Sequence, residues 1–93
     1  MLLDTRILPG RVLMTEQQVL DTFSRILRDL LGDESIVLKM ESTRADVSGW
    51  DSFNYVNFIV AVEIQLGVKF SVAEVESFEN VGAIVSRTKA MLG

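Results

Sequence analysis

The segment from Ser52 to Leu66 constrains the fold of this chain most, because it is long, lacks Pro and Gly, and is apolar nearly all round. At about 100° per residue, its apolar side chains fall on two roughly opposite faces of a helix. One face holds Tyr55, Phe58, Ile59, Val62 and Leu66, and the other holds Phe53, Val56, Val60 and Ile64. We therefore predict that one face is buried in a bundle and that the other meets something else.

Three further segments carry helix signals. Thr15 and Gln18 form a candidate capping box before a single apolar stripe, and Gly32 ends that helix. Ser71 is a candidate cap for a brief helix over 72–77, after a short extended link, and Asn80 is one for a last helix. The two inward stripes consist of Val19, Leu20, Phe23, Ile26, Leu27, Leu30 and Leu31, and of Val81, Ile84, Val85, Thr88 and Leu92. The pattern predicts an all-α fold, a small three- to four-helix bundle with a long loop between helices one and two.

That loop covers residues 33–51, where charged, Ser and Thr residues alternate with isolated apolar ones and no period is sustained. A connection of this length in a small domain is unusual and often functional. It needs apolar anchors on the helices, for which the candidates are Ile36, Leu38, Val47 and Trp50. We interpret Trp50 as a packing anchor rather than a ligand contact.

Composition excludes several classes of function. The 93 residues fit one domain, and nine basic against thirteen acidic side chains give a net charge of -4 without a Lys or Arg cluster, which argues against nucleic acid as a partner. The chain has no cysteine and no histidine, so disulfides, thiolate nucleophiles, imidazole bases and the usual zinc ligands are excluded. We expect a protein that is not an enzyme and binds no metal. No apolar run is long enough for a membrane span and no secretory signal is evident, so we expect a cytoplasmic protein.

The first thirteen residues contain the only Pro-Gly pair and no clear period. We interpret residues 1–13 as a loose leader and residues 14–93 as the functional domain, with Met14 as a candidate start. The alternative is that the leader's apolar residues pack onto the bundle; these are Leu2, Leu3, Ile7 and Leu8.

The run Gly49-Trp50-Asp51-Ser52-Phe53 places a serine hydroxyl at the start of the long apolar helix. Asp51 or Ser52 can cap the unpaired amides of the first turn. Those amides and the helix dipole favour a negatively charged group attached to Ser52. By itself Asp-Ser before an apolar helix is most often a plain N-cap. A hydroxyl held at that helix end and reachable by another protein has the chemistry of a phosphate attachment point.

Most of residues 14–93 resembles the acyl carrier protein family. The strongest likeness is Gly49–Phe53, which is similar to the family signature Gly-Trp/Ala-Asp-Ser-Leu. Val56, Ile59 and Glu63 continue it, and Leu66–Phe70 closes it. Residues 78–82, Phe-Glu-Asn-Val-Gly, look like the segment that opens the family's last helix.

The resemblance implies that Ser52 receives 4'-phosphopantetheine from coenzyme A through a separate, Mg²⁺-using phosphopantetheinyl transferase. It gives Asp51 the roles of helix cap and transferase recognition. The thiol of the arm would hold acyl groups as thioesters and present them to acyl-loading and acyl-using enzymes. A chain without cysteine needs a cofactor to supply that sulfur, which agrees with the residue inventory.

The sequence departs from the family on the long helix. Phe53 stands where Leu is usual, and family members usually have acidic residues at the positions of Asn54, Asn57, Ile64 and Gln65. Carriers of fatty-acid synthesis typically present that acidic face to basic patches. Its dilution favours a free-standing, specialised carrier in lipid, polyketide or related biosynthesis over a general fatty-acid role.

We hypothesise that partners bind the outer face of this helix, and we expect a monomer; the candidate contacts are Phe53, Val56, Asn57, Val60 and Ile64. The alternative is that the loop or the leader covers this face. A second candidate function is an unmodified helical interaction module that docks partners or itself there.

The sequence leaves open whether an acyl chain stays in solvent or enters the bundle, because the residues able to line a pocket are also needed as core: Phe23, Ile26, Phe58, Ile59, Val62 and Ile84.

Overall fold

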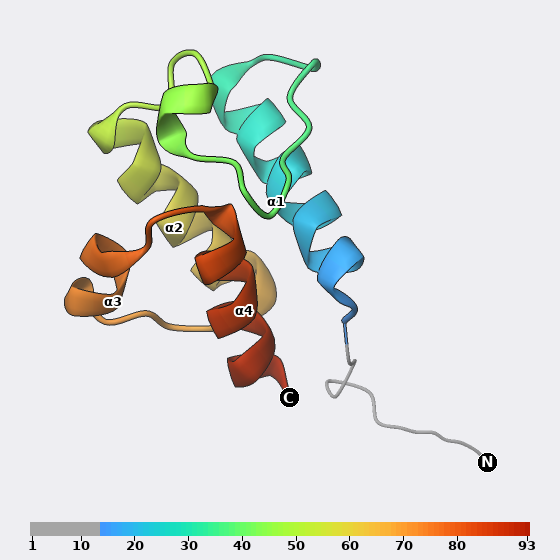
Figure 1. Ribbon diagram of the computed structural model, residues 1–93, viewed down its shortest axis with the longest axis vertical. Helices are drawn as coiled ribbons and strands as arrows, with labels where there is room; N and C mark the ends of the chain where they lie inside the picture. The colour runs from blue at the N-terminus through green and yellow to red at the C-terminus, as the bar shows by residue number, and fades with distance from the viewer. Residues whose placement is uncertain (1–13) are drawn as a thin grey trace.

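The structure, a computed structural model, describes residues 14–93, and all regular elements of that part are helical (Figure 1). They are α1 (Glu16–Leu31), the 3₁₀ helix η2 (Arg44–Asp46), α2 (Ser52–Leu66), α3 (Val72–Ser77) and α4 (Val81–Leu92). The predicted all-α bundle is confirmed. Residues 1–13 lie outside the described residues, so their interpretation as a loose leader stays a prediction.

The helix ends follow from local side-chain chemistry. The Thr15 hydroxyl accepts from the Gln18 amide at 3.1 Å, and the Gln18 side-chain oxygen accepts from the Thr15 amide at 2.8 Å, so the predicted capping box is present. Gly32 and Gly67 end α1 and α2 in the left-handed conformation at φ 66° and 67°. The predicted bounds of α2 and of the helix over 72–77 are confirmed.

The core lies where α1 packs against both α2 and α4. Phe23 of α1 and Phe58 of α2 are fully buried and meet edge to face with ring centroids 5.3 Å apart. The inward face predicted for α2 is confirmed, since Phe58, Ile59 and Val62 are buried and Tyr55 and Leu66 pack against the core. In Figure 1, α3 lies on the other side of α4 from α1.

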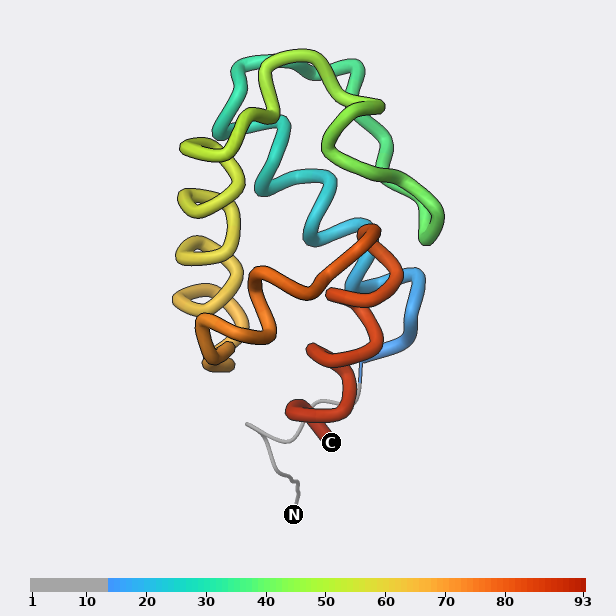
Figure 2. Tube along the Cα trace, turned by 60° about the vertical axis from the view of Figure 1, so that its left-hand side comes forward, coloured from blue at the N-terminus to red at the C-terminus, as the bar shows by residue number. Residues whose placement is uncertain are grey.

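The long loop crosses one end of the bundle before it reaches α2 (Figure 2). Three of its predicted anchors, Ile36, Leu38 and Trp50, are buried, and Val47 packs against the core. Within the loop, η2 was not predicted from the sequence. The Asp46 carboxylate, which accepts from the Thr43 amide at 2.9 Å, stabilises this single turn.

Hydrogen bonds fix the loop to α1 and α4. The Leu38 amide donates to the buried Ser24 hydroxyl of α1 at 2.9 Å. The first amides of α4, from Val81 and Gly82, donate to the Ser42 and Met40 carbonyls at 2.8 and 2.7 Å. The loop therefore satisfies amides at the N-terminus of α4 that the helix itself leaves unpaired.

Candidate functional site

Ser52 is the first residue of α2 and is exposed. Asp51 is the N-cap, and its carboxylate accepts from the Asn54 amide at 2.8 Å. The Asn54 side chain in turn donates to the Gly49 carbonyl at 3.0 Å. The sequence allowed either Asp51 or Ser52 as the N-cap. The structure has Asp51 in this role, so the Ser52 hydroxyl does not cap the helix.

Two backbone amides in the first turn of α2 have no acceptor among the described residues. The Tyr55 amide donates to the Asp51 carbonyl at 2.8 Å, whereas the amides of Ser52 and Phe53 make no hydrogen bond to the described residues. Such amides, together with the positive end of the helix dipole, favour an anionic group. The residues around the Ser52 hydroxyl therefore fit a tethered phosphodiester.

Trp50 fixes the entry into α2. Its side chain is 4 % exposed and meets Phe58 edge to face at 5.2 Å between ring centroids. The prediction that Trp50 is a packing anchor is confirmed. Its indole N–H has no hydrogen-bond acceptor in the part of the chain that the structure describes.

A groove of about 820 Å³ opens beside Ser52, lined by η2, α2, α3 and the start of α4. Its lining is mainly apolar and includes Ile59, Val75 and Ile84. Of the six residues considered from the sequence for a pocket, Ile59 and Ile84 line this groove. The other four are core residues that do not line it: Phe23, Ile26, Phe58 and Val62.

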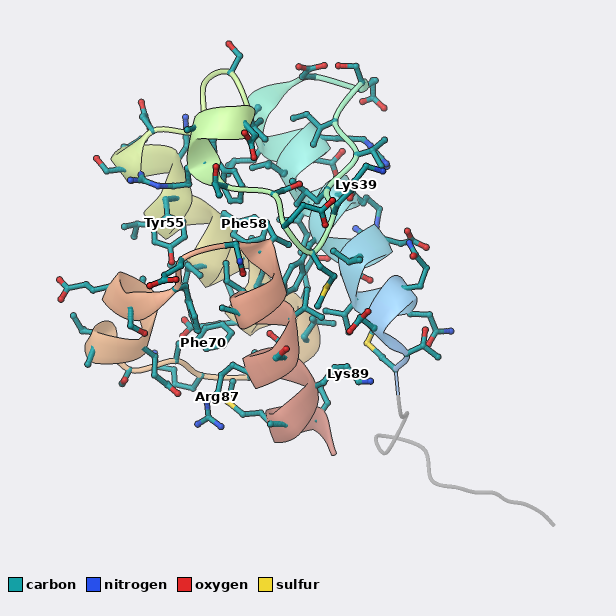
Figure 3. All side chains as sticks on the ribbon, in the orientation of Figure 1. Lys39, Tyr55, Phe58, Phe70, Arg87 and Lys89 are labelled. Atoms are coloured by element: carbon teal, nitrogen blue, oxygen red, sulfur yellow. The ribbon has the colours of Figure 1, made fainter. Side chains whose placement is uncertain are left out.

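Tyr55 of α2 lines the groove and contacts both η2 and α3. Its side chain extends from α2 towards α3 (Figure 3). Its hydroxyl donates to the Val75 carbonyl of α3 at 2.6 Å, and the Arg44 guanidinium of η2 lies 5.1 Å from its ring centroid. Burial raises the pKa of Tyr55, and the nearby Arg44 charge opposes part of this rise. Sequence reasoning assigned Tyr55 to the core alone, because nothing in the periodicity indicates the contacts with Arg44 and Val75.

The outer face of α2 is open in the described structure. Phe53, Val56, Val60 and Ile64 are 73, 54, 44 and 76 % exposed, and Asn57 is partly buried. The predicted second face therefore exists, and the loop does not cover it. Whether the leader covers it lies outside the described residues.

The chain is 33 % identical over 72 residues to an acyl carrier protein of Clostridium acetobutylicum, a match that covers 77 % of this chain and 94 % of that protein. This chain belongs to the acyl carrier protein family. The fold agrees: the solution NMR structure of the holo acyl carrier protein from Geobacter metallireducens matches this family member with a TM-score of 0.73 at 34 % identity, covering 78 % of this chain and 84 % of that one. No protein-family model matches the chain.

The comparisons confirm the family resemblance found in the sequence and the bundle fold. Within the described residues, no helix of this acyl carrier protein has the length and apolar character needed to cross a membrane.

Proposed function

We propose that this protein carries acyl groups as thioesters on a 4'-phosphopantetheine arm attached to Ser52. The observation that supports this most directly is that Asp51, not Ser52, caps α2. This leaves an exposed hydroxyl beside two amides that make no hydrogen bond to residues 14–93. When bound, the arm supplies the thiol that this cysteine-free chain lacks.

In attachment by the transferase, the Ser52 oxygen loses its proton and bonds the phosphorus next to the pantetheine of coenzyme A, while adenosine 3',5'-bisphosphate leaves. The chain contributes position and charge to this step. Asp51 holds the first turn of α2 in place, and the amides of Ser52 and Phe53 offer donors to an anion. The buried Trp50 ring keeps the preceding loop from moving away.

The groove beside Ser52 supports partial burial of an apolar cargo. Ser52 and apolar side chains such as Ile59 and Val75 line the same space, so a group tethered at Ser52 has an apolar surface next to its attachment point. An acyl chain that enters there is shielded from water near the tether.

The sparse acidity of α2 supports a specialised pathway over general fatty-acid synthesis. The cargo belongs to a lipid, polyketide or related biosynthetic set with its own loading and using enzymes.

The test is incubation with coenzyme A, Mg²⁺ and a broad-specificity phosphopantetheinyl transferase, followed by intact mass. Wild type is expected to gain one arm and Ser52→Ala none. Ser48→Ala removes another exposed serine four residues away and serves as the matched control, which should gain the arm. A wild type that gains no arm, or an arm that persists in Ser52→Ala, contradicts the proposal and leaves the unmodified interaction module.

A further inference from the structure

The indole N–H of Trp50 is a buried donor that folding leaves unused. The Trp50 side chain is 4 % exposed, and its ring lies 5.2 Å from the Phe58 ring and 6.3 Å from the Tyr55 ring between centroids. Within residues 14–93, its N–H is the one buried side-chain polar group without a hydrogen-bond partner. Buried tryptophan N–H groups usually have an acceptor, because an unpaired buried donor costs free energy. Packing alone does not account for this donor, since a phenylalanine ring would pack on Phe58 without that cost.

The donor belongs to the wall of the groove beside Ser52. Trp50 and Ser52 both line this space, together with apolar side chains such as Ile59. Tyr55, another aromatic donor on this wall, already donates its hydroxyl hydrogen to the Val75 carbonyl at 2.6 Å. A molecule in the groove therefore meets an apolar surface and, at Trp50, an N–H that lacks an acceptor among the described residues.

A tethered cargo reaches this donor more readily than a free molecule does. The N–H is buried, so bulk water does not serve as its acceptor. A group attached at Ser52 stays beside the groove at an effective concentration on the order of millimolar. An oxygen on such a group comes to the N–H when its chain occupies the groove.

The groove also restricts which oxygen it accepts. The ionisable side chains that line it are three carboxylates and two cations: Glu63, Glu76, Glu79, Arg44 and Lys69. A cargo carboxylate is disfavoured by this acidic excess and by its own desolvation against the mainly apolar lining. A neutral keto or hydroxyl oxygen has a smaller desolvation cost and accepts the indole hydrogen. A saturated chain leaves the N–H unpaired.

We propose that the cargo carried at Ser52 is an oxygenated acyl chain, and that Trp50 recognises its keto or hydroxyl oxygen by donating the indole N–H. This inference rests on the proposed function and names the class of cargo that the groove holds best. An oxoacyl chain gains both apolar burial and a hydrogen bond, whereas a saturated chain of the same length gains burial only.

The first test follows the indole proton by NMR, because Trp50 is the single tryptophan of the chain and gives one indole resonance. The full chain is loaded to completion with an octanoyl arm, or with oxooctanoyl arms whose keto group lies near the arm, in mid-chain or near the end. An amide replaces the thioester to prevent hydrolysis. In at least one oxooctanoyl form, the indole proton should shift downfield and exchange with water about fivefold more slowly than in the octanoyl form.

Thermal unfolding of the loaded proteins separates the hydrogen bond from packing. In wild type, the oxooctanoyl form with the largest indole shift should unfold roughly 4 °C above the octanoyl form. Trp50→Phe removes the donor and should abolish this difference, while both of its loaded forms lose the same packing. Phe23→Leu, a core substitution away from the groove, is the matched control and should keep the difference.

Equal indole shifts in all loaded forms, or a Tm difference that persists in Trp50→Phe, overturn the cargo assignment while Ser52 modification stands. If Trp50→Phe does not fold, the indole resonance of wild type decides by itself. A wild type that accepts no arm at all overturns the proposed function, and this inference with it.

Discussion

Gly82→Ala is expected to destabilise the protein although alanine is the better helix former. Gly82 is the second residue of α4, and a Cβ built on it lies 2.7 Å from the Met40 carbonyl oxygen, well inside the 3.4 Å at which ordinary contact begins. The obstacle is backbone and not a side chain that can rotate away. The loop must therefore move back from the start of α4.

Two hydrogen bonds weaken when the loop moves. The Gly82 amide donates to Met40 at 2.7 Å, and the neighbouring Val81 amide donates to Ser42 at 2.8 Å. Overpacking and weakened buried hydrogen bonds together cost about 2–3 kcal/mol, against a helix-propensity gain of about 1 kcal/mol. The net loss in the free energy of unfolding is about 1–2 kcal/mol, or a fall in Tm of roughly 5–10 °C.

Urea denaturation followed by circular dichroism measures this loss. Ser86→Ala, at an exposed position of the same helix, is the control and should equal or slightly exceed wild type in stability. In the Gly82→Ala variant, amide hydrogen exchange should also accelerate more in the loop than in α1. A variant as stable as wild type, with the loop amides equally protected, would refute the close-approach argument.

Three further changes have defined outcomes. Tyr55→Phe removes the hydrogen bond to the α3 carbonyl and should lower the free energy of unfolding by about 1 kcal/mol, with faster hydrogen exchange in α3 than in α1. The hydrogen bond from the Ser71 amide, and then Arg87, hold the pKa of Glu74 below 4.5, so its charge stabilises the fold above that pH and less as the pH falls through the folded pKa. The stability gap between wild type and Glu74→Gln, followed by denaturation, should therefore be present at about pH 7 and close towards about pH 3. Asp51→Ala should lose about 1 kcal/mol of cap stability while Asp51→Asn retains most of it, and a transferase rate that falls in Asp51→Asn identifies the charge, not the cap, as the recognised feature.

The helices could be predicted because their signals are local. The bounds of α2 depend on Asp51 at one end and Gly67 at the other, and those of α3 begin with a cap at Ser71. Each signal acts within one helical turn, so no tertiary information is needed. The apolar anchors of the loop were predictable for a similar reason, since an isolated apolar side chain such as Trp50 in a polar segment has only the core in which to be buried.

The contacts that shape the groove could not be predicted in this way. Tyr55 meets a carbonyl twenty residues away, and the α4 amides meet a loop that no periodicity locates. Choosing between Asp51 and Ser52 as the cap also needed coordinates. Both side chains can accept a hydrogen bond, and only the backbone path decides that the carboxylate one residue before the helix reaches the Asn54 amide.

Folding and the proposed chemistry use different residues at the start of α2. Asp51 caps the helix and Trp50 packs against the core, while the Ser52 side chain is exposed and makes no hydrogen bond to the described residues. A hydroxyl that contributes to neither capping nor packing can be modified without loss of stability, and it can be removed with equally little effect on the fold. Loss of the arm in Ser52→Ala therefore reports on the hydroxyl itself and not on an unfolded helix.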